Sequence, residues 1–337
     1  MTVLDVAKRA GVSAMTVSRV TSGSPNVIEE TRARVQAAIN ELGYTPNVDA
    51  RNLKSPGQRK IGLLYGNPSA SYSNELVVSV LGSLSILGYQ LLLEKCASRR
   101  SERLCAEKVI RAGVSGVILP TPLCDSPELL AQFDEAGIPT VLVGTGRENA
   151  SGSSVRIDNF RAAQEMTCYL LSLGHEKIGF IQGHPQQIDS AQRYQGFRQA
   201  MKDAGIPVNT EWVKQGYYTY RSGLTAAEEI LGGKYRPTAI FASNDDMAAG
   251  ALTAAHKLRL SVPEELSVVG FDDSPVADIV WPSLTTIRQP IERLTKLALS
   301  MLLEEIRHRR NGASRTNRQK VIRLTMVKRE SAGPRPQ

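Results

Sequence analysis

Apolar runs and helical stretches alternate along most of this 337-residue chain. The apolar runs lie at 61–64, 91–93, 116–119, 140–143, 177–181, 238–241 and 266–269. Stretches typical of helices lie between them or follow them, at 75–87, 102–112, 128–136, 160–173, 192–204, 222–231 and 246–258. Strands that alternate with helices form right-handed βαβ units and parallel sheets. We therefore expect an α/β fold with seven strands, grouped as four and three in two doubly wound parallel-sheet lobes.

The first 60 residues have a different character. They hold nine Lys/Arg and five Asp/Glu, and so carry half of the chain's net charge of +8. Concentrated positive charge is typical of a segment that binds phosphates. Charge alone favours a merely solvated segment, so the helix pattern has to decide between the two.

Two short amphipathic helices joined through Gly11 are predicted at the N-terminus. Thr2 is placed to cap the first helix, which runs to about Ala10, and Ser13 is placed to cap the second. A third helix is expected from Glu29 to Leu42. The residues expected to form the core between the helices are Leu4, Val6, Ala7, Val12, Val17, Val20, Val35, Ala38, Ile39 and Leu42. This arrangement lays the second helix into the DNA major groove.

The outward residues of the second helix limit how it reads DNA. Arg19 is the best candidate for a base contact, because a guanidinium bonds O6 and N7 of guanine together. A phosphate contact or a surface ion pair is the alternative for Arg19. Ala14 and Met15 can meet only a thymine methyl group, so specificity is expected to depend on Arg19, Ser18 and DNA deformability.

Residues 46–54 form a second candidate DNA-binding segment. A helix of about eight residues is marginal in water because nucleation is costly, so this one should form only where DNA orders it. Residues 55–59 read as a linker.

Nine segments together resemble the LacI/GalR family of bacterial transcription regulators over nearly the whole chain. They are residues 2–20, 42–47, 50–54, 155–159, 173–178, 193–197, 242–248, 268–273 and 282–289. The resemblance implies an all-α helix-turn-helix headpiece with a hinge helix, followed by an α/β module similar to type I periplasmic sugar-binding proteins. It also implies that the hinge helices of two subunits pair in the minor groove, where Leu53 would wedge a central base step open. An apolar wedge kinks the duplex, and Arg51 and Lys54 can reach the adjoining groove and phosphates. A core role is the alternative for Leu53.

The domain boundaries implied by the resemblance are residues 1–45 for the helix-turn-helix domain and 46–59 for the hinge helix and linker. Residues 60–330 would form the two-lobed effector-binding and dimerisation domain, with an N-lobe of about 60–157 plus 290–319. The C-lobe would take about 158–289 plus 320–330, and residues 331–337 would be a flexible tail. The implied DNA contacts are Thr2, Ser13, Ala14, Met15, Thr16, Ser18, Arg19, Asn47, Ala50, Arg51, Leu53 and Lys54.

Polar residues follow the predicted strands where open α/β sheets bind ligands. Asp, Asn and Arg side chains supply the acceptors and donors that sugar hydroxyls need. The resemblance makes Arg193, Asn244 and Asp272 the core of an effector site, with Gln289 and Asp158 beside them. Helix capping is the alternative for either Asn244 or Asp245.

The first-lobe side of the site is left open, because residues 144–149 depart from the Asp-Arg pair that often occurs here in the family. Tyr72 belongs to a polar loop, with Tyr65, Asn67, Ser69 and Ser73, that can stack on a sugar face; a surface tyrosine is the alternative. His175 follows Gly174 in a helix-to-strand turn and is read as structural.

Signatures of other protein classes are absent from the sequence. It contains no phosphate-binding G-x-x-x-x-G-K-[ST] and no G-x-S-x-G, and its four histidines lack metal-ligand spacing. Cys96, Cys105, Cys124 and Cys168 show no C-x-x-C spacing and are expected to be buried free thiols. We therefore expect no catalytic residue, no cofactor and no metal. With no signal peptide and no run of about 18 apolar residues, a cytoplasmic protein without membrane contact is expected.

The sequence thus predicts a regulator that binds double-stranded, pseudo-palindromic operator DNA as a homodimer. Repression released by a sugar or oligosaccharide inducer between the lobes is the favoured mechanism. A corepressor-dependent or sugar-acid-responsive regulator of the same family is the alternative. A solute-binding receptor or an enzyme on the same two-lobed fold is the alternative from another class.

Overall fold

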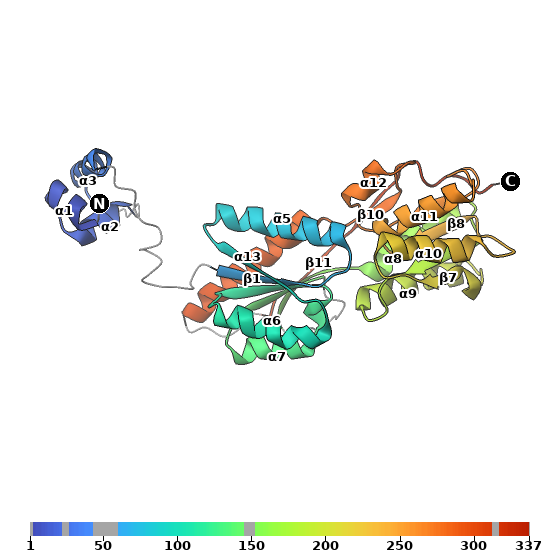
Figure 1. Ribbon diagram of the computed structural model, residues 1–337, viewed down its shortest axis with the longest axis horizontal. Helices are drawn as coiled ribbons and strands as arrows, with labels where there is room; N and C mark the ends of the chain where they lie inside the picture. The colour runs from blue at the N-terminus through green and yellow to red at the C-terminus, as the bar shows by residue number, and fades with distance from the viewer. Residues whose placement is uncertain (1–2, 22–26, 43–59, 145–151, 312–316, 337) are drawn as a thin grey trace. The chain divides into compact units, whose positions relative to one another are not determined.

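The structure of the protein is a computed structural model that describes residues 3–21, 27–42, 60–144, 152–311 and 317–336. The chain divides into two compact units, Met1–Gln58 and Arg59–Gln337, whose helices and strands are labelled in Figure 1. The predicted hinge helix at residues 46–54 lies outside the described residues.

Three helices form the small unit: α1 (Val3–Ala10), α2 (Ala14–Thr21) and α3 (Glu29–Glu41). Gly11 has a φ of +65°, a left-handed conformation that lets the chain turn between α1 and α2. The core consists of Val6, Ala7, Ala10, Val17, Val20, Val35, Ala38 and Ile39. The expectation that Leu4 joins this core was wrong, since Leu4 is 67% exposed. Residues two apart on a helix point roughly 200° away from each other, so the burial of Val6 turns Leu4 outward.

The N-lobe of the large unit is a parallel sheet in the order β11-β5-β4-β3-β1-β2. Its strands are β1 (Lys60–Tyr65), β2 (Gln90–Lys95), β3 (Gly116–Pro120), β4 (Thr140–Val143), β5 (Ser153–Ile157) and β11 (Gln319–Ile322). Helices α5 (Ala70–Ile86) and α13 (Ile291–Arg310) cover one face (Figure 1). Helices α6 (Arg99–Arg111) and α7 (Pro127–Glu135) cover the other, next to the short 3-10 helix η1 (Leu123–Asp125). Apolar side chains therefore point to both faces of the sheet.

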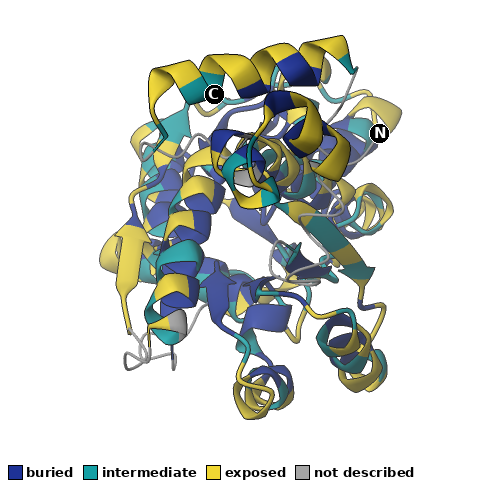
Figure 2. Ribbon diagram, turned by 90° about the vertical axis from the view of Figure 1, so that its left-hand side faces the viewer, coloured by how far each residue is buried: buried dark blue, intermediate teal, exposed yellow. Residues whose placement is uncertain are grey.

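The C-lobe has the same construction around a smaller parallel sheet, in the order β7-β6-β8-β9. Its elements are α8 (Asn159–Ser172), β6 (Ile178–Gln182), α9 (Ile188–Asp203), η2 (Thr210–Trp212), β7 (Val213–Gln215), α10 (Tyr220–Leu231), β8 (Ala239–Ala242), α11 (Asp245–Lys257), β9 (Ser267–Val269) and α12 (Pro275–Ile279). Phe241 packs in the core on the α8 and α9 side, and its neighbour Ile240 packs on the α10 and α11 side. Figure 2 shows buried strands in the interior of the large unit and helices whose outer faces are exposed.

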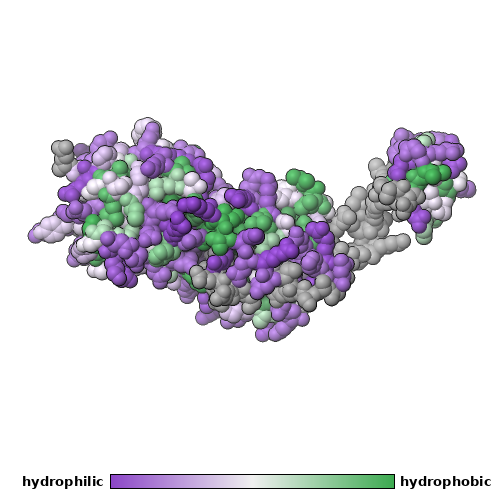
Figure 3. Space-filling view, turned by 180° about the vertical axis from the view of Figure 1, so that it is seen from behind, coloured by the Kyte–Doolittle hydropathy of each residue, from purple (hydrophilic) through white to green (hydrophobic). Residues whose placement is uncertain are grey.

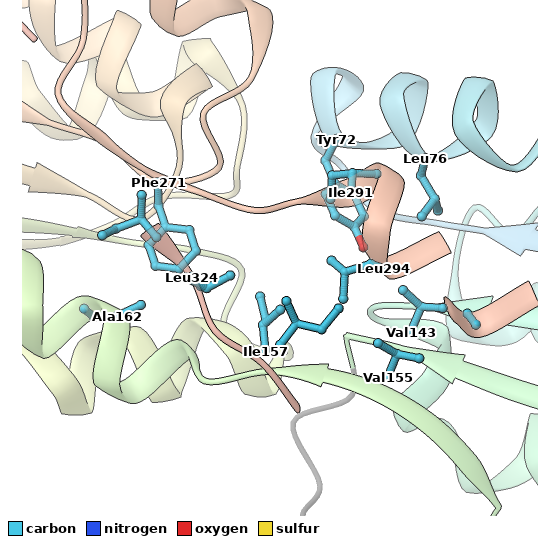
Figure 4. Close-up of a cluster of buried hydrophobic side chains, with 14 of the residues drawn as sticks. Tyr72, Leu76, Val143, Val155, Ile157, Ala162, Phe271, Ile291, Leu294 and Leu324 are labelled. Atoms are coloured by element: carbon cyan, nitrogen blue, oxygen red, sulfur yellow. The ribbon is translucent and has the colours of Figure 1, made fainter. Parts of the chain in front are cut away.

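Three chain crossings join the two lobes. The chain passes from β5 to α8, from β10 (Thr286–Arg288) to α13, and from β11 to β12 (Thr325–Val327). Strands β10 and β12 pair antiparallel beside these crossings. One hydrophobic cluster runs through this region and includes Ile157, Phe271, Ile291 and Leu324 (Figure 4). The cores of the two lobes are thus continuous where the chain crosses.

Several expected boundaries differ from the structure. The sequence favours one further strand around Val321 to Val327, but the structure has two strands there, because β11 extends the N-lobe sheet to Ile322 before the chain returns to the C-lobe. The sheets also contain the short strands β5 and β7, which the division into four and three strands omitted. Helix α5 begins at Ala70, not at Glu75, because the Ser69 side chain caps it by accepting a hydrogen bond from the Tyr72 amide.

The last residues were expected to be a flexible tail, and residues 331–336 are instead docked on the C-lobe. Ser331 is fully buried, and the Arg335 amide donates to the Leu173 carbonyl over 2.9 Å. His175 bridges Thr238 and the Gly333 carbonyl through its two ring nitrogens, at 2.9 and 3.0 Å. The sequence-based interpretation of His175 as structural is confirmed. The sequence did not reveal that His175 contacts residues 331–336 through the Gly333 carbonyl.

The cysteines agree with the expectation at three of four positions. Cys96, Cys105 and Cys124 are buried free thiols, whereas Cys168 is a free thiol on an exposed face of α8. Within the described residues, no group of three or more His, Cys, Asp or Glu side chains could hold a metal ion. No described helix is both long enough and apolar enough to cross a membrane.

Close packing of α10 against α11 depends on two glycines, Gly223 and Gly250. A Cβ atom on Gly250 would lie 2.4 Å from the Leu224 nitrogen and 2.5 Å from the Tyr220 oxygen. We expect Gly250→Ala to lower the free energy of unfolding by about 1–3 kcal/mol, because the helices must move apart. Denaturant unfolding of the full chain measures this.

Gly233→Ala is the matched control, because its nearest neighbour would be 3.6 Å away. Its stability should stay within about 0.5 kcal/mol of the parent protein. A Gly250→Ala protein as stable as the parent would contradict this account of the helix pair.

Candidate functional sites

A narrow pocket lies between the two lobes of the large unit. Three groups of residues line it, contributed by the N-lobe, the first crossing and the C-lobe side. They are Asn67, Ser69, Tyr72, Thr121, Gly144, Ile157, Asn159, Asp189, Arg193, Tyr218, Asp272 and Gln289. The loops at the carboxyl ends of the parallel strands supply many of these residues, and such loops are the usual ligand-binding edge of open α/β sheets.

Arg193 lies at the centre of the polar wall. It extends from α9 and is 3% exposed. Its Nε donates to Asn159 Oδ1 over 2.9 Å, and its Nη1 lies 3.6 Å from Asp272 Oδ1. The guanidinium carbon is 3.7 Å from the centre of the Phe271 ring, in cation–π geometry. These contacts fix the plane of the guanidinium, which presents its donors in one orientation.

Asp272 faces Arg193 from the loop after β9. Its φ of +121° is unusual for a residue with a side chain, and two backbone hydrogen bonds hold it there. The Asp272 amide donates to the Ile287 carbonyl over 2.8 Å, and the Gln289 amide donates to the Asp272 carbonyl over 2.9 Å. The Gln289 side chain also donates to Asp272 Oδ1 over 2.6 Å. Burial raises the pKa of the Asp272 carboxyl to about 7, although Arg193 and Gln289 oppose this shift.

Tyr218 and Asp189 form the adjoining part of the wall. Both side chains are buried, and the Tyr218 hydroxyl makes no hydrogen bond of good geometry with a described residue, although it lies close to the Asp189 side chain. Burial raises the pKa of Tyr218 well above its usual value, and the negative charge of Asp189 raises it further. Because a buried polar atom without a partner costs free energy, this hydroxyl marks a position where a ligand atom would be stabilising.

The cavity includes four of the six effector-site residues predicted from the sequence: Tyr72, Arg193, Asp272 and Gln289. Tyr72 is buried rather than a surface tyrosine, and burial raises the pKa of its hydroxyl well above the usual value.

Asp158 and Asn244 were predicted in the site, but the structure uses both as helix caps. Asp158 is exposed and accepts from the Arg161 amide at the start of α8. Asn244 accepts from the Met247 amide over 3.0 Å and donates to the Tyr218 carbonyl. Capping of α11 was the open alternative for Asn244, and it accounts for the residue.

Sequence reasoning left several cavity residues unassigned. Asp189 precedes Arg193 by four residues, so both lie on one face of α9, and this spacing was a usable signal. Asn159 lines the cavity, but the prediction named its neighbour Asp158, which caps α8 instead. Gly144, with a φ of +77°, lines the cavity on the first-lobe side that was left open. Thr121 and Tyr218 lie in loops without a local pattern that would have marked them.

The small unit presents a second candidate site, a groove along α2 and α3. Val12, Ser13, Thr16, Arg19, Val27, Ile28, Thr31 and Arg34 line it. Ser13 accepts from the Thr16 amide over 3.1 Å at the start of α2, as the predicted cap requires. Hydroxyl and guanidinium donors on one face of a helix are suited to DNA phosphates and base edges.

The predicted DNA-contact residues fall into three groups in the structure. Ser13 and Arg19 are exposed and Met15 is 64% exposed, whereas Ala14 and Thr16 are half-buried. The Ser18 side chain is not described. The others, Thr2, Asn47, Ala50, Arg51, Leu53 and Lys54, lie outside the described residues.

Known proteins are similar to both units of this chain. Residues 2–47 match the family described as bacterial regulatory proteins, lacI family, and residues 167–332 match the periplasmic binding protein-like domain. The HTH-type transcriptional repressor PurR of Pectobacterium carotovorum subsp. carotovorum is 40% identical over 344 residues, which cover 99% of this chain and 98% of that protein. The PurR repressor of Photorhabdus laumondii subsp. laumondii is also 40% identical, over 93% of this chain and 92% of its own.

Two solved structures show the same architecture. The lac repressor dimer bound to operator and the anti-inducer ONPF has a TM-score of 0.84 and 26% identity, over 99% of both chains. The complex of the transcriptional regulator CelR with cellobiose has a TM-score of 0.73 and 32% identity, over 98% of this chain and 99% of that one. The helix-turn-helix unit, the two-lobed module and the extent of these matches show that this chain is a DNA-binding transcriptional regulator of the LacI family.

Proposed function

We propose that the chain is a repressor whose operator affinity is set by a neutral sugar or oligosaccharide held in the cavity between its lobes. The observation that carries this proposal is the buried Tyr218 hydroxyl, which makes no hydrogen bond of good geometry with a described residue, next to the fixed donors of Arg193 and the acceptors of Asp189 and Asp272. A sugar hydroxyl both donates and accepts, so one ligand can satisfy all of these groups. The cellobiose bound by CelR, a relative of the same fold, supports this class of effector.

The charge of the cavity argues against the sugar-acid alternative. Asp189 and Asp272 supply two carboxylates and Arg193 the one guanidinium among the lining residues. The positive charge of Arg193 is paired with Asp272, since Arg193 Nη1 lies 3.6 Å from Asp272 Oδ1. A carboxylate on the effector would therefore meet like charge at Asp189 in a desolvated site, where repulsion is strong.

The proposed mechanism is release of DNA when the sugar binds. A ligand that prefers one arrangement of the lobes shifts the equilibrium between arrangements, and the hinge at residues 46–54 transmits that shift to DNA. Corepression, in which the same site strengthens operator binding, remains the second candidate, and the relatives named PurR are repressors. Either mechanism belongs to a cytoplasmic protein with access to the chromosome.

The proposed assembly is a homodimer on a pseudo-palindromic operator. Large apolar side chains on the surface of the large unit support it, among them Val78 and Leu81 on α5. Trp281 is 84% exposed, and Ile279 at the end of α12 is exposed as well. Figure 3 shows apolar side chains gathered on part of the surface of the large unit. Exposed apolar patches are typical of interfaces, so sedimentation equilibrium should give a dimer that Trp281→Ser weakens.

A thermal-shift screen of the full chain tests the effector class. Neutral mono- and disaccharides, cellobiose among them, are compared with gluconate and glucuronate at equal concentration. A sugar at about 100 times its Kd should stabilise the protein by about 2.7 kcal/mol. Stabilisation by the acids alone, or by none of the neutral sugars, would overturn the proposed effector class.

The affinity for the sugar should depend on pH through Asp272. Its pKa is raised from 3.8 to about 7, so the carboxyl of the unliganded protein is largely protonated in mild acid. Stability that comes from this protonated form is present in acid and is lost as the pH rises through about 7. A sugar hydroxyl that donates to the ionised form should bind roughly tenfold more tightly at pH 8 than at pH 6. Calorimetric titration measures the sugar affinity at each pH, and Asp272→Asn should abolish its dependence on pH. A parent protein whose sugar affinity does not change with pH would exclude a hydrogen bond from the sugar to Asp272.

A further inference from the structure

One carboxylate joins the two lobes outside the polar wall described above. Asp246 Oδ2 accepts from the Ser69 hydroxyl over 2.9 Å, and Asp246 Oδ1 accepts from the Ser71 hydroxyl over 2.8 Å. The two serines are at the start of α5 in the N-lobe, and Asp246 is in the first turn of α11 in the C-lobe. Both carboxylate oxygens are therefore used to connect segments that lie far apart in the sequence.

The geometry gives this carboxylate a role that helix capping does not explain. Asn244 already caps α11 by accepting from the Met247 amide. Asp246 instead extends to the N-terminal turn of α5, so the positive ends of two helix dipoles meet at one negative charge. Hydrogen bonds to an ionised acceptor are about twice as strong as neutral ones, and this carboxylate receives two.

The contact also lies at the edge of the cavity. Ser69 lines the cavity, and its hydroxyl oxygen accepts from the amide of Tyr72, another lining residue. Breaking the Ser69–Asp246 bond would therefore release the segment that positions Tyr72 and would also remove a contact between the lobes at the edge of the cavity.

We propose that Asp246, Ser69 and Ser71 form a latch that holds the lobes closed over the cavity and positions Tyr72 in its wall. In this account Asp246 is a positioning residue, and opening of the cavity requires both of its hydrogen bonds to break. The latch stands on the contacts themselves. Only its consequence for operator binding rests on the proposed function.

Thiol labelling of the full chain measures the opening of the lobes without effector or DNA. Thr121 lines the cavity and is buried, so Thr121→Cys places a reporter thiol there, and Cys168→Ser removes the exposed native thiol. In this background Asp246→Ala should raise the labelling rate of the reporter by roughly tenfold or more, as the loss of a charged hydrogen bond implies. Ser71→Ala should cause a smaller rise, because the Ser69 bond remains.

The double variant Asp246→Ala/Ser71→Ala should label no faster than Asp246→Ala alone, because loss of the acceptor already removes the Ser71 bond. Glu128→Ala is the matched control, since Glu128 is also in the first turn of a helix and accepts a serine hydroxyl, from Ser126, within the N-lobe. Cys105, buried in the N-lobe core, reports general loosening. A latch is excluded if the reporter thiol of Asp246→Ala is labelled no faster than in its background, or if the rate increases of Asp246→Ala and Ser71→Ala multiply in the double variant. It is also excluded if Glu128→Ala raises the labelling rate of the reporter as much as Asp246→Ala does, or if the Cys105 thiol shows the same increase in rate.

Discussion

Replacing Arg193 with methionine is expected to lower the free energy of unfolding by about 3–5 kcal/mol at pH 8, because it leaves the buried carboxylate of Asp272 without its cation. The two groups are 3.6 Å apart and almost fully buried, so water cannot take the place of the guanidinium. Asp272 can escape the penalty by protonation, and its pKa of about 7 makes that easy in acid. The loss of stability should therefore shrink as the pH falls from about 8 to about 5.

Denaturant unfolding of the full chain at several pH values measures this effect. The double variant Arg193→Met/Asp272→Asn should recover much of the lost stability at pH 8, since both charges are then removed. Arg198→Met is the matched control, because Arg198 lies on the same helix but is exposed beside Tyr194. A loss for Arg193→Met that does not change with pH would show that its packing on Phe271 matters more than its charge.

Replacing Arg19 with alanine is expected to weaken operator binding by roughly 5- to 150-fold, the range implied by about 1–3 kcal/mol for a bidentate base contact. Arg19 is exposed on α2 in the groove with Ser13 and Thr16, while Met15 on the same helix offers no hydrogen bond. Binding to unrelated DNA should fall much less, because a lost phosphate contact acts on all sequences alike.

Lys8→Ala is the control for Arg19→Ala, since it removes one exposed positive charge from α1. It should weaken specific and nonspecific binding by similar factors and reduce the salt dependence by about one charge. Fluorescence anisotropy with operator and with scrambled duplexes separates the two cases. If Arg19→Ala behaves like Lys8→Ala, Arg19 contacts only phosphate.

The sequence predicted most of the fold because the dominant signals are local. Gly11, the Ser13 cap and the spacing of Val6, Val17 and Val35 determined the three N-terminal helices to within about a residue. The buried runs of the parallel sheets are just as clear, because both faces of those sheets are covered. The short strands β5 and β7 were missed because their few residues pair with distant segments that no local pattern reveals.

The candidate effector site was predicted less completely, for a physical reason. Capping and ligand binding use the same residue types at the same strand ends, so Asn244 and Asp158 were assigned to the cavity although they cap helices. The sequence did not identify Tyr218 as a cavity residue, because its position depends on tertiary packing against Gly183. A Cβ atom on Gly183 would lie 2.1 Å from the Tyr218 ring. The role proposed for Asp246 depends on contact between lobes, which sequence alone cannot supply.

The wedge role of Leu53 stays a prediction. Leu53→Ala should reduce specific binding far more than nonspecific binding, because an apolar wedge acts only where the duplex is kinked. Ala14 and Met15 can make no bidentate base contact, so the hinge is expected to carry a large share of specificity through DNA deformation.

The central claim is that the cavity between the lobes controls DNA binding, and anisotropy titration of the full chain tests it most directly. An operator selected from a random duplex library is titrated with and without the neutral sugar that stabilises the protein. We expect the sugar to change the operator Kd at least tenfold in the parent chain, equivalent to about 1.4 kcal/mol of coupling. Asp272→Asn should bind the operator normally and lose that change. A sugar that binds the parent cavity and leaves the operator Kd unaltered would contradict the account.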